Sequence, residues 1–421
     1  MSSGLASLGL LASASLVAVC IVRPRLASWV PDILVYLALG LAFGACGLCV
    51  QFGLQLSAGP AAGAASAAQT AALYLLVFSS CADLKITSLQ RHLLEVGTLL
   101  AASVAAFAVG LITVGHIPAL APDATLQAAG DGARLAYFLA LSLGVMVCSV
   151  PFLTKIFLNV GLQRSPFAHG LLLAACFIDI LVWALFSVAV NLRQGNGLVV
   201  DTLVQQVLRG LGLTLAAGAL AGLAFQGLAH GLRRRRREAP WMLLLATSLL
   251  FIGLMHAAGL EPVIGMVLCG LAVAPHRDVF GTAIGRSQAL AVTLGAPIYF
   301  TCVGFGIQPS SIVSLEAVGV FILWSSVIKI TSVSLAAGFI RRPGERRLDY
   351  GIAMNTRGGP GLVLAGSAYA AGLIPITGFV ALTSASVLTA LVTELYLKAA
   401  APRILAADEA SSTTAQPLRS L

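Results

Sequence analysis

The chain has 421 residues, of which 58% are hydrophobic and only 10% are charged. Soluble domains carry roughly 25% charged residues, so the composition excludes a water-soluble globular protein. The mean hydropathy is +0.96, and runs such as 243–254 and 312–327 are apolar on every face. Strands of a membrane barrel would alternate in polarity instead, so the runs indicate membrane-spanning helices.

A helix that crosses a bilayer needs about 20 apolar residues, and this length divides the sequence into about thirteen predicted spans. In chain order they are 5–22, 32–50, 66–82, 94–114, 134–157, 167–190, 203–229, 240–257, 261–275, 289–306, 314–340, 349–372 and 376–400. The first has no basic segment before it, which favours a retained helix over a secretory signal. We therefore predict an all-α polytopic membrane protein with a transmembrane domain at 1–402 and a short disordered tail at 403–421, which the charge distribution described next places in the cytoplasm.

The formal net charge is +9, and most of the 25 Lys and Arg residues fall in alternate predicted loops. These residues are Arg23, Arg25, Lys85, Arg91, Arg164, Arg233 to Arg237, Arg277, Arg286, Arg341, Arg342, Arg346 and Arg347. Because cytoplasmic loops collect positive charge, we expect the N-terminus outside and the C-terminus in the cytoplasm. The arginine run 233–237 is interpreted as a topology anchor at lipid headgroups, so no nucleic acid is expected as a partner. The predicted location is a plasma (inner) membrane, crossed many times.

Enzymatic motifs are missing from the sequence. It contains no GxxxxGK[ST], HExxH or GxSxG motif, and its six histidines are scattered singly. The eight cysteines all lie in apolar runs, where a thiol behaves as a small hydrophobic group. Cys46 and Cys49 form a CxxC with no partner pair nearby to complete a zinc site. We expect neither an enzyme nor a cofactor.

Two charged residues fall in the middle of predicted spans, where an ionisable group is a functional hypothesis by default. Asp179 lies halfway along the sixth span and Lys329 near the middle of the eleventh. In one interpretation they form a buried pair that only fixes helix register. In the other, Asp179 binds a proton and a monovalent cation in turn, and Lys329 acts as a competing internal cation.

Other charged residues are weaker candidates. Several lie within a turn or two of span ends, where their side chains can reach the interface. These are Asp32, Lys85, Glu95, Glu261, Glu316 and Lys398. Asp83 and Glu394 lie near the cytoplasmic ends of their helices, where either residue would line an entrance to the ion path.

Helix breakers interrupt two spans at mid-depth, at Cys148–Pro151 in the fifth and Met354–Gly361 in the twelfth. Proline removes a backbone donor and disfavours a helical residue before it. Unwound backbone inside a membrane must be buried or line a cavity, where its carbonyls and helix ends suit ions. Because the twelfth span is an odd number of crossings after the fifth, the two broken helices run in opposite directions. The pattern predicts inverted repeats with two discontinuous crossing helices.

Six motifs in order along nearly the whole chain carry a family resemblance. They are Pro31 to Tyr36 with Gly40 and Gly44, Ser149-Val150-Pro151 with Asp179, Gly259 to Leu271, Pro297 to Gly304, Lys329, and Asn355 to Gly358. Together they resemble the monovalent cation:proton antiporter superfamily (sodium/hydrogen exchanger family), which includes bacterial Na⁺ or K⁺/H⁺ antiporters and plant cation/proton exchangers.

The resemblance implies a secondary active transporter that exchanges Na⁺ or K⁺ for H⁺ by alternating access, in a lipid bilayer and as a homodimer. It also implies an elevator-like motion of one helix bundle against another. Asp179 falls on the essential aspartate, which holds the monovalent metal ion, and Lys329 on the basic core residue. The remaining ion- or proton-binding positions are Ser149, Val150, Asn355, Thr356 and Arg357.

Three positions depart from the family pattern. Ile178 stands where relatives have a second carboxylate or an Asn, Gly359 replaces an acidic residue, and Thr393-Glu394 replaces Thr-Pro. These departures keep open a second interpretation, an antiporter-fold protein without coupled exchange, such as a regulatory or exporter-like relative. A third alternative is a symporter of organic anions, which would need further polar side chains around the site.

Overall fold

The computed structural model describes residues 32–45, 60–82, 89–122, 130–163, 165–193, 200–235, 240–258, 260, 262–306, 315–341 and 344–414. Within these ranges all regular structure is helical. Every predicted span that falls on described residues contains a helix, whereas the span 5–22 lies outside them. In the described part of the chain, eight helices are long and apolar enough to cross a membrane. The polytopic helical architecture is confirmed, while the total of about thirteen spans stays a prediction.

The described helices are numbered along the chain, with gaps where residues lie outside the description. In chain order they are α2 (Asp32–Ala45), α4 (Pro60–Ala82), α5 (Leu89–Val114), α7 (Asp131–Met146), α8 (Val150–Asn159), α9 (Pro166–Arg193), α10 (Val200–Arg235), α11 (Pro240–Ala257), α12 (Pro262–Val273), α13 (Arg277–Leu290), α14 (Ala296–Gly306), α15 (Leu315–Ala336), α16 (Arg347–Met354), α17 (Gly358–Ala370) and α18 (Ile376–Thr414). Short 3₁₀ turns cover Pro118–Leu120, Ala274–His276 and Ala337–Phe339.

Proline marks the start of four helices. Pro60, Pro166, Pro240 and Pro262 are the first residues of α4, α9, α11 and α12. The first helical position has no intrahelical partner for its N–H, so proline loses nothing there and its fixed φ suits the helix. The same residue type that breaks a helix interior therefore sets the helix boundaries along this chain.

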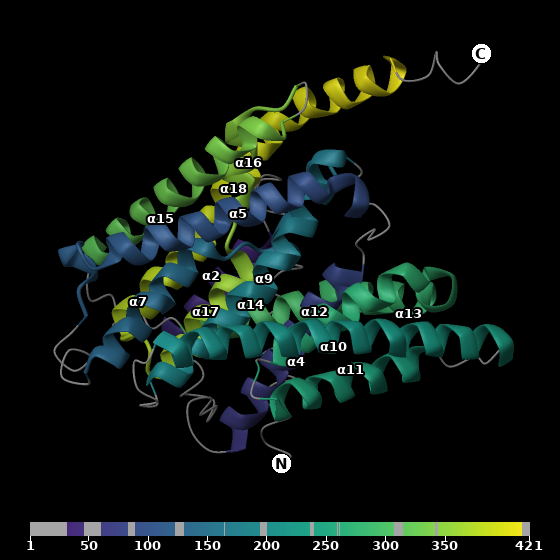
Figure 1. Ribbon diagram of the computed structural model, residues 1–421, viewed down its shortest axis with the longest axis horizontal. Helices are drawn as coiled ribbons and strands as arrows, with labels where there is room; N and C mark the ends of the chain where they lie inside the picture. Colours follow the sequence, from purple (N-terminus) through teal and green to yellow (C-terminus); the bar gives the residue numbers. More distant parts are fainter. Residues whose placement is uncertain are drawn as a thin grey trace.

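The helices form two packed groups (Figure 1). In the core unit, α5 packs against α7, α9 and α15, while α18 packs against α15, α16 and α17. In the scaffold unit, α12 packs against α4, α10 and α11, and α14 packs against α2 and α4. We include α8 in the core unit and α13 in the scaffold unit. The units meet where α9 contacts α10 and α12, and where α8 contacts α4.

The structure differs from the sequence prediction at α13. The predicted spans leave residues 276–288 as a connection, but Arg277–Leu290 is helical and continues through a π-helical turn, Ala291–Gly295, into α14. Arg277, Asp278 and Arg286 make this stretch too polar for a rule based on apolar length.

The predicted disordered tail at 403–421 is also corrected in part. Helix α18 continues to Thr414, and only 415–421 lie outside the described residues. Alanine is the strongest helix former and is frequent here. Arg403 is also held by the buried carboxylate of Asp349, at an N–O distance of 2.8 Å. Local propensity and one tertiary contact together extend the helix.

Candidate ion-binding site

Both predicted helix breaks are present. Residues 147–149 separate α7 from α8, and residues 355–357 separate α16 from α17. Pro151 and Pro360 each lie in the first turn of the second half-helix, where a missing N–H leaves no carbonyl unsatisfied. The positions of both breaks therefore follow directly from the sequence.

The two breaks touch each other. The Ser149 amide donates a hydrogen bond of 2.7 Å to the Thr356 carbonyl. The Cys148 Sγ lies 4.0 Å from the Met354 Sδ. Residues more than 200 positions apart in sequence thus join two unwound segments, which places four half-helix ends at one point in the core unit.

Lys329 on α15 is fully buried and binds the end of the first broken helix. Its Nζ donates to the carbonyl of Met146, the last residue of α7, at 2.6 Å and to the Ser103 Oγ at 2.9 Å. The C-terminus of a helix carries partial negative charge, so the ammonium is stabilised there. Among the described residues it makes no ion pair with Asp179, so the interpretation as a register-fixing pair is wrong.

Arg357 is the second fully buried cation and lies in the other break. Its Nη2 donates to the Asn355 Oδ1 at 3.2 Å, and its guanidinium lies 5.9 Å from the centroid of the Phe321 ring. The backbone amide of Arg357 donates to the Thr389 Oγ1 at 3.4 Å. Within the described part of the chain, Nε and Nη1 have no hydrogen-bond acceptor.

Asp179 lies in the middle of α9 and is 4% exposed. Its Oδ1 has no hydrogen-bond donor among the described residues. Its helix α9 packs against α7 and α8, the two halves of the first broken helix, and against α16 of the second. A buried carboxylate is costly unless it is protonated or paired with a cation. The arrangement is therefore suited to bind a proton or a cation at this oxygen.

The remaining predicted residues have separate positions. Val150 is the first residue of α8, and the Thr356 Oγ1 is buried without a partner in the described structure. Glu394 lies away from the crossing and accepts a 3.1 Å hydrogen bond from the Asn159 Nδ2 at the end of α8. Asp83 lies outside the described residues.

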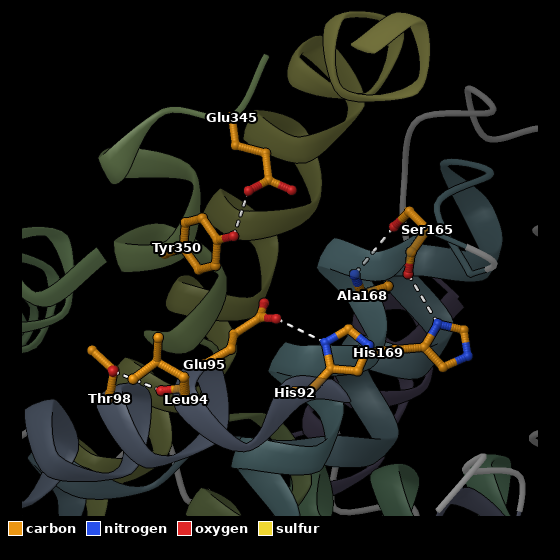
Figure 2. A network of polar contacts seen from close by, with 9 residues as sticks. All are labelled: His92, Leu94, Glu95, Thr98, Ser165, Ala168, His169, Glu345 and Tyr350. Atoms are coloured by element: carbon orange, nitrogen blue, oxygen red, sulfur yellow. Dashed lines mark hydrogen bonds and ion pairs between the residues drawn. The ribbon is translucent and has the colours of Figure 1, made fainter. Parts of the chain in front are cut away.

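Further polar residues lie on α5, at the start of α9 and on α16 with the residues before it, at another place in the core unit (Figure 2). The His92 Nδ1 lies 2.8 Å from the Glu95 Oε2, and Tyr350 donates to Glu345. A Cβ on Gly170 of α9 would overlap the Glu95 carboxylate, so glycine makes room for it. The sequence predicts that Glu95 reaches the membrane interface, but it is 5% exposed and is hydrogen-bonded inside the bundle.

Sequence reasoning missed the acceptors of the Lys329 ammonium and of the Arg357 backbone amide. The ammonium donates to the Ser103 Oγ and to the Met146 carbonyl, and the Arg357 amide donates to the Thr389 Oγ1. Serine and threonine commonly bond to their own helix, as the Ser103 Oγ also does to the Leu99 carbonyl. The sequence indicates only one of these acceptors, the Met146 carbonyl, because a predicted helix break leaves backbone carbonyls without an intrahelical donor.

The fold and the site define a multi-pass membrane protein in which two broken helices cross beside a buried aspartate. The model of the transmembrane sodium/hydrogen exchanger family matches residues 11–401, and the chain belongs to this family, which is a family of transporters. A similar protein is Cation/H(+) antiporter 20 of Arabidopsis thaliana, which is 23% identical over 248 residues, 56% of this chain. The chain covers 29% of the length of that relative.

Proposed function

We propose that the protein is a secondary active transporter that exchanges Na⁺ or K⁺ for H⁺. The observation that carries this proposal is the buried Asp179 carboxylate, whose Oδ1 has no donor among the described residues. Family membership and the similarity to a cation/H⁺ antiporter support it. A proton and a cation exclude each other at one carboxylate, so a protein that exposes this site to each side in turn couples their gradients.

The two buried cations favour this coupling. Lys329 holds the C-terminus of α7 and Arg357 lies buried in the second break, so each break has one buried cation that competes with a bound ion. A weakly held cation leaves such a site readily, which exchange requires. Because Asp179 is the one family carboxylate retained at this point, beside Ile178, we propose a one-for-one exchange.

The same proposal includes the architecture. A helix, a three-residue break and a second helix with an early proline occur in α7–α8 and again in α16–α17. This repetition supports inverted repeats, which place a site at the middle of the membrane. We propose that the core unit moves against the scaffold unit in a homodimer, with the C-terminus in the cytoplasm of a cell whose plasma membrane contains the protein.

The test uses purified protein in vesicles that contain a pH-sensitive dye. After a proton gradient is imposed, Na⁺, K⁺ and Li⁺ are added in turn. We expect one or more of these cations to discharge the gradient, and Asp179→Asn to abolish the discharge because the amide binds neither ion. Asp131→Asn is the matched control, since Asp131 is exposed in the first turn of α7.

Gradient discharge that persists in the Asp179→Asn protein would overturn the assignment of this residue. If correctly folded wild-type protein discharges the proton gradient with none of the three cations, the alternative is favoured, a relative without coupled exchange. The observation that speaks for that alternative is that Ile178 replaces a carboxylate or an Asn of the family and Gly359 replaces an acidic residue.

A further inference from the structure

Two buried thiols face each other across the boundary between the two units. The Cys81 Sγ on α4 lies 3.9 Å from the Cys176 Sγ on α9, and each residue is 1% exposed. Both are free thiols in the structure. Cys81 belongs to the scaffold unit and Cys176 to the core unit, so the pair joins the two elements that the proposed mechanism moves apart.

Cys81 is held in place by close packing of α4 against α12, and Cys176 lies on α9 near Asp179. A Cβ on Gly270 of α12 would lie 2.6 Å from the Cys81 Cβ and 2.8 Å from the Phe78 carbonyl, so glycine is needed for α12 to support α4 here. Cys176 is one helical turn before Asp179 on α9, on the same face. The thiol of Cys176 therefore lies one helical turn from the proposed cation-binding residue.

The geometry selects a class of metal ion. Zinc prefers four ligands, yet the described residues contain no group of three or more His, Cys, Asp or Glu side chains that fits a metal. Thiolates favour soft ions such as Cu⁺, and these d¹⁰ ions accept two sulfurs on opposite sides. With metal–sulfur bonds of about 2.3 Å, the sulfurs would lie roughly 4.6 Å apart, which requires a small opening of the pair.

The charge near the pair agrees with this chemistry. Lys329 and Arg357 are buried cations, and Asp179 is the buried carboxylate of the same site. When a monovalent ion binds, each thiol releases its proton and each sulfur donates an electron pair to the metal. The resulting complex carries one negative charge, which offsets the excess positive charge of the ion site.

We propose that Cys81 and Cys176 form a two-sulfur site for a soft monovalent cation, Cu⁺ or Ag⁺, which reaches it along the path to Asp179. A metal bound to both sulfurs ties α4 to α9 and so stops movement of the core unit against the scaffold unit. This inhibitory effect rests on the proposed exchange function, whereas the binding itself does not.

The test uses Ag⁺ as the probe in chloride-free buffer, with bound silver measured by mass spectrometry after desalting. A pair-only protein keeps Cys81 and Cys176 and has serine at the other six cysteines. We expect it to retain one silver ion per protomer with two sulfur neighbours in X-ray absorption. In that background, Cys81→Ser and Cys176→Ser should each lower the silver affinity by about 100-fold or more, because one of two thiolate bonds is lost.

The reverse variant, Cys81→Ser/Cys176→Ser with the other six cysteines intact, checks inhibition in vesicles. Silver should block cation/proton exchange in the wild-type protein and leave this variant active. Equal silver binding in the pair-only and single-serine proteins, or one sulfur neighbour in the absorption spectrum, would overturn the proposed site. If the protein exchanges no cation, the binding and absorption measurements still decide the metal site independently of the proposed function.

Discussion

Gly358 is the residue on which the crossing of the two broken helices depends most directly. Its φ is +42°, which places it in the left-handed region. A Cβ at this position would overlap the Phe152 ring and would lie 2.8 Å from the Ser149 Oγ. The next residue, Gly359, has open space around the position of a Cβ. Two adjacent glycines therefore have different structural requirements.

We predict that Gly358→Ala destabilises the protein and abolishes exchange, while Gly359→Ala leaves the thermal midpoint nearly unchanged. The left-handed backbone alone costs about 1–2 kcal/mol with a Cβ, and the overlap with Phe152 adds to it. Thermal unfolding of the two purified variants in detergent makes the comparison. An equal midpoint for both would show that the crossing is not as closely packed as the structure indicates.

At the same scale, Asp179 and Lys329 are predictable from sequence because charge in the middle of an apolar span is rare and costly. The acceptors of Lys329 are predictable only in part. The Met146 carbonyl lies at a break that the sequence predicts, whereas the Ser103 Oγ does not differ in sequence from many other hydroxyls. The contact between Cys81 and Cys176 was not predictable either. The two residues are 95 positions apart, and only the packing of the helices brings them together.

At the scale of elements, α16 and α18 are joined by a buried carboxylate. Asp349 at the start of α16 is fully buried and accepts from the Arg403 Nη2 at 2.8 Å and from the Tyr396 hydroxyl at 2.8 Å. It also accepts from the backbone amide of Arg346 at 2.6 Å, which fixes the start of α16. The Asp349 side chain thus caps the N-terminus of α16, the first half of the second broken helix, and also binds Tyr396 and Arg403 near the end of α18.

We predict that Asp349→Asn loosens the end of α18 and lowers stability by about 1–3 kcal/mol, because buried donors lose a charged acceptor. Hydrogen exchange should become faster at residues 396–414. The matched control is Asp278→Asn, whose ion pair with Arg233 has a distance of 2.6 Å but whose partners are more than half exposed. An exposed pair contributes little, so the control should exchange at the wild-type rate. Unchanged protection of α18 in Asp349→Asn would contradict the role given to this contact.

The elements themselves were largely predictable, because length and hydropathy locate the long helices, while proline and glycine locate their starts and the two breaks. Two features were not. Helix α13 is too polar to meet an apolar-length rule, and α18 extends beyond its apolar part through alanine propensity and the Asp349 contact.

At the scale of the molecule, the outer faces of the bundle are apolar. Large exposed hydrophobic residues lie on α10 and α11 of the scaffold unit, among them Leu208, Leu215, Met242 and Leu250, and on α5 and α15 of the core unit, among them Leu94, Ile112, Leu323 and Leu335. Such an extended apolar surface is unfavourable in water and is natural against lipid or a second copy. The polar groups are gathered inside the core unit instead, at the crossing and in the His92–Glu95 cluster. Among the described residues both units therefore have apolar outer faces, and the buried charged side chains lie inside the core unit.

Competition between a cation and a proton for Asp179 is the step on which the proposed exchange depends. Proton release from purified protein in weakly buffered detergent solution tests this competition most directly. Adding the transported cation should release about one proton per protomer, because the carboxylate must lose its proton to hold the metal ion. The Asp179→Asn protein should release none. Cation binding without proton release, or the same release from the variant, would contradict competition at this carboxylate.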